Sequence, residues 1–222
     1  MKLRLYALAA VLGLASVPTR VTAANTMPKT GLAGTTHDIG GIGCKSCHAP
    51  HSGALANGGP QSTGLIMLWS RSFPAAANTF GVYDSATMGN KGVEVGGSAL
   101  TTSSDTRMYS LLCLSCHDGV TSTFTTAMKQ TNVVGYKSTF GGTTYTDSLG
   151  LTNDHPIAIA YNPTASINDP LQPLATVQAA GLPLYGSTNT LQCATCHDSH
   201  NNTNTNYLRQ ANNTTHCTSC HM

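Results

Sequence analysis

Residues 191–221 read LQCATCHDSHNNTNTNYLRQANNTTHCTSCH and contain one pattern twice: two cysteines separated by two residues, then a histidine. The same pattern occurs at 44–48 as CKSCH and at 113–117 as CLSCH, and these four copies use all eight cysteines of the chain. This C-x-x-C-H pattern is typical of covalent attachment of c-type haem. The two thiols bond to the vinyl groups on one edge of the porphyrin, and the histidine then lies under the ring, where its imidazole reaches the iron.

We therefore expect four haems per chain. The predicted attachment residues are Cys44, Cys47, Cys113, Cys116, Cys193, Cys196, Cys217 and Cys220. The predicted proximal iron ligands are His48, His117, His197 and His221.

Other uses of paired cysteines are less consistent with the pattern. Eight cysteines in an exported chain could form four disulfides, C-x-x-C pairs could bind zinc, and a C-x-x-C unit could be a thiol redox motif. None of these uses requires a histidine after every second cysteine. With nine histidines in 222 residues, four such placements are not expected by chance.

Five further histidines are candidates for the second axial position of the irons: His37, His51, His155, His200 and His216. Because the methionines show no relation to the motifs, we expect histidine on both sides of every iron, and hence low reduction potentials. His51 and His200 each follow a proximal histidine by three residues. Each therefore lies on the proximal side of its own haem, and we expect it to bind the iron of an adjacent haem. His216, directly before a motif, is expected to do the same.

His37 lies early in the chain, and two interpretations of it stay open. Termini are often loosely held unless they dock, so His37 could bind the iron of a second protomer. Alternatively, His37 binds within its own chain and another of the five histidines is the spare one.

The composition lacks the large side chains that ordinarily build a core. Only 6% of the residues are aromatic and 9% are charged, while glycine contributes 22 and proline 10 of the 222 residues. We therefore predict a mostly irregular coil with short helices, wrapped around a stack of haems that supplies the apolar core. Within it we predict a short helix at 173–180 and strand propensity over 120–149, and we expect Trp69 to pack on a haem edge.

The N-terminus has the pattern of a secretory signal peptide. Basic Lys2 and Arg4 precede an apolar run at 5–17, and small residues precede Ala24. We predict a signal peptide over residues 1–23 and a tetrahaem domain over 24–222. Cleavage would change the formal net charge from +2 to −1, with eight basic and nine acidic residues. We expect an exported protein without a membrane span, and the absence of a Lys/Arg cluster argues against nucleic-acid binding.

The chain resembles exported multihaem c-type cytochromes with doubled C-x-x-C-H motifs, and most closely the tetrahaem outer-surface cytochromes of metal-reducing bacteria that polymerise into nanowires. The resemblance rests on GIGCKSCHAPHSGA at 41–54, CLSCHDGV at 113–120, NDHPI at 153–157, LQCATCHDSH at 191–200 and HCTSCH at 216–221. It implies bis-histidine haems in a continuous stack along a filament, with one iron taking a histidine from the adjacent subunit. On this resemblance His37 is the residue assigned to the inter-subunit bond.

Three functions are consistent with these observations. The first is an electron conduit toward an extracellular acceptor, as a single protein or as a filament, with other cytochromes or redox proteins as partners. The second is a periplasmic shuttle cytochrome that carries the same haems without assembling. The third is a multihaem reductase of a small oxyanion, which needs an iron with an open coordination position. Five spare histidines argue against such an opening, so we expect an electron carrier without catalytic residues rather than an enzyme.

Overall fold

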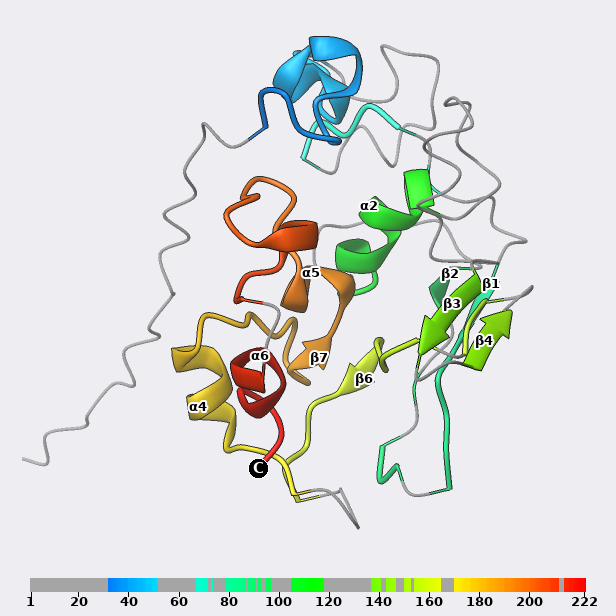
Figure 1. The fold of residues 1–222 in the computed structure, drawn as a ribbon, viewed down its shortest axis with the longest axis vertical. Coiled ribbons are helices and arrows are strands. Elements are labelled where there is room, and N and C mark those ends of the chain that lie inside the picture. The colour runs from blue at the N-terminus through cyan, green and yellow to red at the C-terminus, as the bar shows by residue number, and fades with distance from the viewer. Residues whose placement is uncertain are drawn as a thin grey trace, which may run out of the picture.

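The computed structural model describes residues 32–51, 67–71, 73, 79–86, 88–90, 92, 95–96, 105–117, 137–140, 143–146, 150–152, 154–164, 170–211 and 214–222. In these ranges short helices and short strands are joined by irregular segments (Figure 1). The first motif, drawn in blue, lies at one end of the long axis, and the C-terminus lies toward the other end. The four motifs are therefore spread along the molecule.

The helical elements are short. In chain order they are η1 (Ile39–Gly41), η2 (Gly43–Ser46), α2 (Met108–His117), α4 (Leu174–Ala179), α5 (Cys193–Cys196), η4 (Thr205–Tyr207) and α6 (Thr214–Thr218). Among the described residues, no helix is long and apolar enough to cross a membrane.

Helix α2 begins at an acidic turn and contains the whole second motif. Asp105 accepts a hydrogen bond from the Arg107 backbone N–H at 3.0 Å, and the Arg107 guanidinium forms an ion pair with the same carboxylate. This pairing lowers the pKa of Asp105, through the Arg107 side-chain hydrogen bond first. Met108, Leu111 and Leu114 recur every three residues, so they lie on one face of the helix and are buried.

The strands form three small sheets. In the first, β1 (Thr79–Val82) pairs antiparallel with β2 (Val95–Gly96) and parallel with β5 (Gly150–Leu151). Strand β3 (Lys137–Phe140) pairs antiparallel with β4 (Thr143–Thr146), which confirms part of the strand propensity predicted over 120–149; residues 120–136 and 147–149 lie outside the described residues. The third sheet pairs β6 (Ile159–Ala160) with β7 (Thr190–Leu191). Strand β7 leads into the third motif, so this sheet holds the start of α5.

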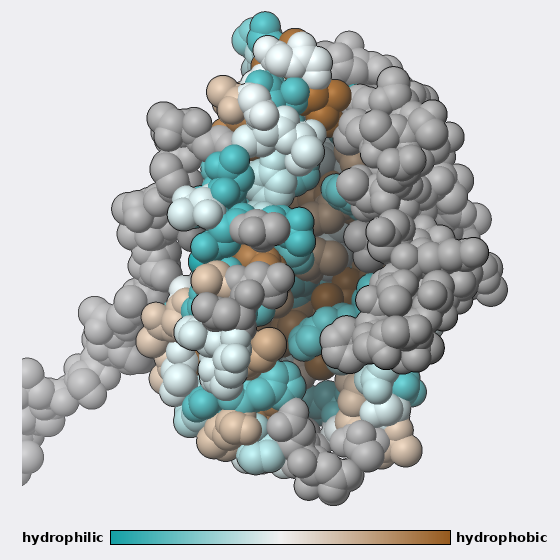
Figure 2. All heavy atoms as spheres, in the orientation of Figure 1, coloured by the Kyte–Doolittle hydropathy of each residue, from teal (hydrophilic) through white to brown (hydrophobic). Residues whose placement is uncertain are grey.

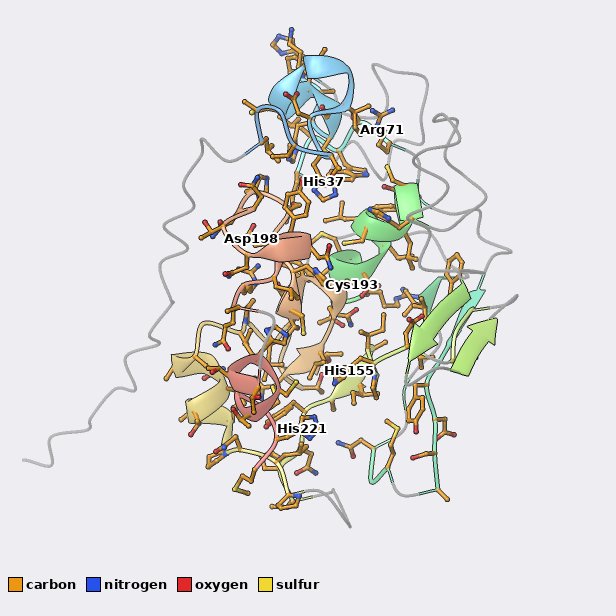
Figure 3. The ribbon with its side chains drawn as sticks, viewed as in Figure 1. His37, Arg71, His155, Cys193, Asp198 and His221 are labelled. Carbon is orange, nitrogen blue, oxygen red and sulfur yellow. The ribbon has the colours of Figure 1, made fainter. Side chains whose placement is uncertain are left out.

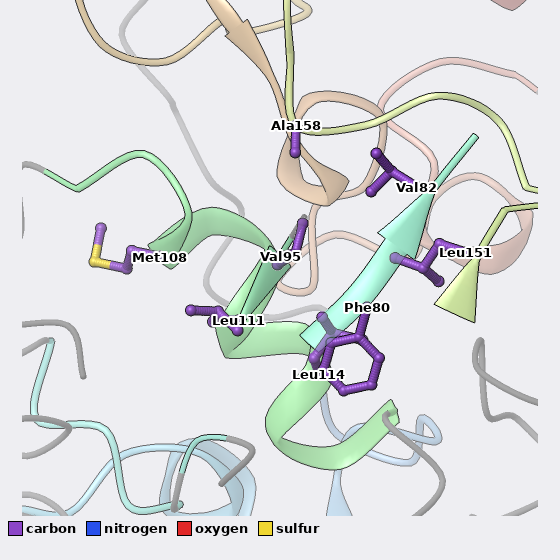
Figure 4. Close-up of a cluster of buried hydrophobic side chains, with 8 residues drawn as sticks. All are labelled: Phe80, Val82, Val95, Met108, Leu111, Leu114, Leu151 and Ala158. Atoms are coloured by element: carbon purple, nitrogen blue, oxygen red, sulfur yellow. The ribbon is translucent and has the colours of Figure 1, made fainter. Parts of the chain in front are cut away.

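Two apolar clusters anchor the motifs. The larger cluster, shown in Figure 4, joins α2 to the first sheet. Its buried members are Phe80, Val82, Val95, Met108, Leu111, Leu114, Leu151 and Ala158. The smaller cluster contains Tyr161, Val177, Leu182 and Leu191, with Cys220 packed against it. The second motif is therefore tied to the larger cluster and the fourth motif to the smaller one.

Helix α4 confirms the helix predicted at 173–180. It begins after Pro173, whose fixed φ suits a helix start, and it ends where Gly181 adopts a φ of +80°. The Gly181 N–H donates to the Gln178 carbonyl at 3.0 Å and the Leu182 N–H to the Val177 carbonyl at 3.3 Å. This is a Schellman ending, which needs the left-handed conformation that glycine adopts at little cost.

Candidate functional site: four C-x-x-C-H motifs and their histidines

The four motifs begin in or lie on helical turns. The first lies on η2, the second on the C-terminal half of α2, the third on α5, and the fourth begins in α6. Helix α5 is stabilised by a capping box between Gln192 and Thr195. A helical turn brings the two cysteines of a motif to the same side, as attachment along one porphyrin edge requires.

Three of the motifs each pair with a second backbone segment in the same way. Isolated antiparallel bridges join His48 to Trp69, His197 to Leu208 and His221 to Leu171. In all three cases a second backbone hydrogen bond lies beside the bridge. The residue after the bridge partner donates its N–H to the carbonyl of the second cysteine of the motif, at 2.8 Å: Ser70 to Cys47, Arg209 to Cys196 and Gln172 to Cys220. We call these three arrangements the docked-segment units. They hold the proximal histidine through backbone contacts.

In the first and third units the docked segment also orients the imidazole. His48 Nδ1 lies 2.6 Å from the Met67 carbonyl oxygen, and His197 Nδ1 lies 2.8 Å from the Asn206 carbonyl oxygen. Met67 and Asn206 have φ values of 54° and 57°, a left-handed conformation that non-glycine residues rarely adopt. With Nδ1–H donating to a carbonyl, Nε2 keeps its lone pair and is the atom available to a metal.

Histidines from distant segments lie in facing pairs. The ring centres are 6.1 Å apart for His37 and His117, 6.3 Å for His48 and His200, and 6.3 Å for His155 and His221. Two imidazole rings on opposite sides of one iron have centres about 6.3 Å apart when each metal–nitrogen bond is about 2.0 Å long. The spacing of these three pairs therefore fits an iron with two axial histidines.

The ring planes differ between the pairs. His48 and His200 are stacked at 13°, whereas the His37–His117 planes meet at 82° and the His155–His221 planes at 85°. Each pair combines one proximal histidine with one of the five distal candidates.

His216 lies near His197, close enough for the charge of His197 to act on it. His216 has a lowered pKa, through burial first and then through the nearby charge of His197. The fifth candidate, His51, is exposed and lies on the chain just after the first motif. Four of the five candidates thus lie near a proximal histidine, and His51 is exposed just after the first motif.

His37 is held inside its own chain. Its ring lies 4.2 Å from the ring of Tyr207, and its backbone N–H lies 3.3 Å from the Tyr207 hydroxyl oxygen. Asp38 accepts backbone N–H groups of Gly34 and Gly43, which closes the surrounding loop. Of the two interpretations of His37, this placement favours binding within its own chain, because Tyr207 and the Asp38 loop dock the segment.

Burial keeps several of the distal candidates uncharged. It lowers the pKa of His37 to about 4, with the neighbouring His117 charge as the second cause. Desolvation by neighbouring protein atoms is also the first cause of the lowered pKa of His155, although its side chain reaches the surface. His37 Nδ1 and His216 Nδ1 are buried without a hydrogen-bond partner. A neutral imidazole is the form that binds a metal, so these environments suit ligands.

Thiols of successive motifs lie near one another. Burial raises the pKa of Cys47 to about 11, and the thiol of Cys116 adds to the shift. The pKa of Cys113 is raised by a hydrogen bond with the Cys193 thiol and by burial. The pKa of Cys196 is raised to about 11 by burial and then by Cys220. Motif one thus neighbours motif two, two neighbours three, and three neighbours four.

The sole tryptophan lies between the first two motifs. Its ring centre is 5.6 Å from that of His48, edge-on at 87°, and its indole N–H donates to Ser115 Oγ of the second motif at 3.1 Å. The expectation that Trp69 packs on a haem edge stays a prediction, and its position beside a proximal histidine is consistent with it.

None of the eight cysteines forms a disulfide. Within the part of the chain that the structure describes, no group of three or more His, Cys, Asp or Glu side chains is arranged to hold one metal ion. The histidine side chains instead come as facing pairs, of which Figure 3 labels His155 and His221. A flat group with a central metal, attached through thiols at its edge, fits this arrangement.

Several contributors to these sites had no signal in the sequence. The docked segments at 67–70, 170–172 and 206–209 share no side-chain pattern, because the contacts they repeat are made by the backbone. Tyr207 and Asp198 also carry no motif. Asp198 becomes noticeable only because it is buried beside His200.

The C-terminal part of the chain matches a known protein family. Residues 187–222 match the doubled CXXCH motif family, over a range that contains the third and fourth motifs. No curated protein matched the chain. The family match supports a multihaem c-type cytochrome with covalently bound haem, and an electron-carrier role is consistent with it.

Proposed function

We propose that each chain carries four covalently attached, bis-histidine c-type haems and passes electrons along them toward an extracellular acceptor. The observation that carries the proposal is the spacing of the histidine pairs, at 6.1 to 6.3 Å between ring centres. Three separate pairs have the separation that one iron with two axial imidazoles requires.

The pairs define the ligand sets. The first iron would be held by His48 and His200, the second by His117 and His37, the third by His197 and His216, and the fourth by His221 and His155. The attached groups supply reversible one-electron chemistry at iron. The chain's own residues would fix the imidazoles and set the spacing between neighbouring sites.

The proximity of the thiols supports a sequential path. Because each motif lies near the next, electrons would follow the order of the motifs, from the first at one end of the molecule to the fourth toward the other end (Figure 1). Hydrophobic residues are visible along the middle of the face in Figure 2, between hydrophilic ones. Such apolar surface is suited to contact with porphyrin planes.

The ligand count distinguishes the conduit from a reductase. A reductase of a small oxyanion needs one iron with an open position, and the four pairs leave none. A periplasmic shuttle would have the same ligand sets, so it differs only in location and assembly.

For assembly, we propose export by the segment at 1–23 and end-to-end contact between chains in a filament. With His37 docked in its own chain, His51 is the spare histidine, and its exposure at the first-motif end makes it the residue we assign to any bond with a neighbouring chain. This assignment replaces His37 in that role.

Two measurements test the proposal. Intact-mass analysis of protein from a host that matures c-type cytochromes should show four covalent haems per chain, and the ferric protein should be entirely low-spin. Fewer haems, or a high-spin ferric signal, would refute the ligand sets. Electron microscopy of extracellular material should show filaments that His51→Ala removes and that a conservative change at an exposed residue, Ser187→Ala, leaves intact.

If the wild type is monomeric outside the cell envelope, or is found only in the periplasm, the filament part fails while the ligand sets stand.

A further inference from the structure

One buried carboxylate lies against a distal histidine. Asp198 follows the third proximal histidine directly and is only 8% exposed. Its Oδ1 accepts the backbone N–H of His200 at 3.0 Å and lies 3.5 Å from His200 Nδ1. Figure 3 shows Asp198 in the upper half of the molecule, below His37. The carboxylate thus shapes the turn that presents His200 and also places its charge beside the imidazole.

An arginine neutralises this carboxylate from the other side. Arg209 Nη1 lies 3.3 Å from Asp198 Oδ2, and its Nε–H donates to the Ala194 carbonyl at 2.9 Å inside the third motif. The side chain of Arg209 is 12% exposed and that of Asp198 is 10% exposed. Solvent therefore screens this pair less than it screens an exposed one.

The other histidines of the four pairs have different neighbours. His48 and His197 face backbone carbonyls, His155 lies 3.2 Å from the Pro156 carbonyl oxygen, and the Nδ1 atoms of His37 and His216 have no hydrogen-bond partner. In the first motif, the residue equivalent to Asp198 is Ala49. Among the histidines whose Nδ1 surroundings the structure describes, His200 is the one with a carboxylate at this distance.

We infer that Asp198 and Arg209 are positioning residues that set the reduction potential of the site held by His48 and His200, acting in opposite directions. The inference rests on the proposed function, because it requires an iron between these two rings.

The direction follows from the charges. Ferric iron carries one more positive charge than ferrous iron, so a nearby negative charge favours the ferric form and lowers the reduction potential. A carboxylate close to Nδ1 also makes the imidazole a stronger electron donor to the metal. Arg209 partly cancels both effects, so its charge raises the potential.

The test uses the full haem-loaded protein in spectroelectrochemical titrations at one fixed pH, fitted to four one-electron steps. Asp198→Asn keeps an oxygen for the His200 N–H and removes the charge, so the midpoint of the site held by His48 and His200 should rise more than the other three. Arg209→Gln should lower the same midpoint. Arg209→Lys keeps the charge and should change it little. We expect about a tenfold change in the equilibrium constant of that step for each charge-removing variant, about 59 mV for a one-electron couple.

A matched control removes a carboxylate that also pairs with arginine but contacts no described histidine. Asp105→Asn should leave the four midpoints nearly unchanged. The inference is overturned if Asp198→Asn and Arg209→Gln shift the midpoint in the same direction, if neither shifts it, or if all four midpoints move equally. A wild type with fewer than four low-spin haems would instead refute the proposed function before any variant is compared.

Discussion

Ser110 joins the second motif to the third, and replacing it should destabilise the protein measurably. Its side chain is fully buried at 0% exposure. Ser110 Oγ donates to Gln192 Oε1 at 2.5 Å and accepts the Cys193 backbone N–H at 3.1 Å. The hydroxyl therefore links helix α2 to the first residue of α5, next to the contact between the Cys113 and Cys193 thiols.

Ser110→Ala removes both hydrogen bonds, so the Cys193 N–H loses its partner and the buried Gln192 side chain keeps only its contact in the capping box. Each unpaired buried group costs about 1–3 kcal/mol. Gln192 is 1% exposed, so water cannot replace the lost hydroxyl without rearrangement. We expect the free energy of unfolding to fall by about 2–4 kcal/mol.

The assay is urea unfolding of the haem-loaded protein, followed through the fluorescence of Trp69, the only tryptophan of the chain. Its emission should rise as unfolding separates it from the haems. Ser187→Ala, at an exposed serine, is the matched control and should stay within about 0.5 kcal/mol of the wild type. If Ser110→Ala also stays within that range, the proposed link between the motifs does not hold.

Three further variants test other parts of the account. Tyr207→Ala removes the ring packed against His37 at 4.2 Å, so part of the ferric protein should become high-spin in electron paramagnetic resonance, whereas an unchanged spectrum would show that Tyr207 does not hold this ligand. Asp105→Asn removes a carboxylate whose pKa Arg107 lowers from its ordinary value of 3.8. The pair of Asp105 with Arg107 therefore stabilises the folded protein above that pH, and this stabilisation is lost as the pH falls through the lowered pKa. The difference in Tm between the wild type and this variant should therefore shrink below about pH 3.8, and a difference that grows there would contradict the ion pair. Gly92→Ala would place a methyl group 2.3 Å from Val82 Cγ2, so we expect a loss of about 1–3 kcal/mol in urea unfolding, and an unchanged midpoint would refute the close packing.

Local chemistry made part of this structure predictable. The C-x-x-C-H spacing predicts attachment thiols and proximal histidines without any knowledge of the fold, because the chemistry lies within five consecutive residues. The short helix α4 was predictable for the same reason, since Pro173 and Gly181 bound it. The β3–β4 hairpin likewise follows from strand-forming residues on both sides of a glycine pair.

Long-range pairing was not predictable. His37 contacts Tyr207, which lies 170 residues later in the chain. The ring of His200, just after the third motif, faces the ring of His48 in the first motif. The sequence left open whether His37 or another histidine was spare, because a count of histidines does not show which one is docked. Likewise, the docked-segment units repeat backbone contacts, which side-chain patterns do not record.

The most direct test of the central claim is the electron paramagnetic resonance spectrum of the fully oxidised wild type, with haem counted by intact mass. Parallel imidazole planes give a rhombic low-spin signal, whereas perpendicular planes give a strongly anisotropic one. The 13° angle of His48 and His200 predicts the first kind for one haem, and the angles of 82° and 85° predict the second kind for two others. Four haems with only low-spin signals, of both kinds, would support the account. A high-spin ferric signal, or fewer than four haems, would contradict it.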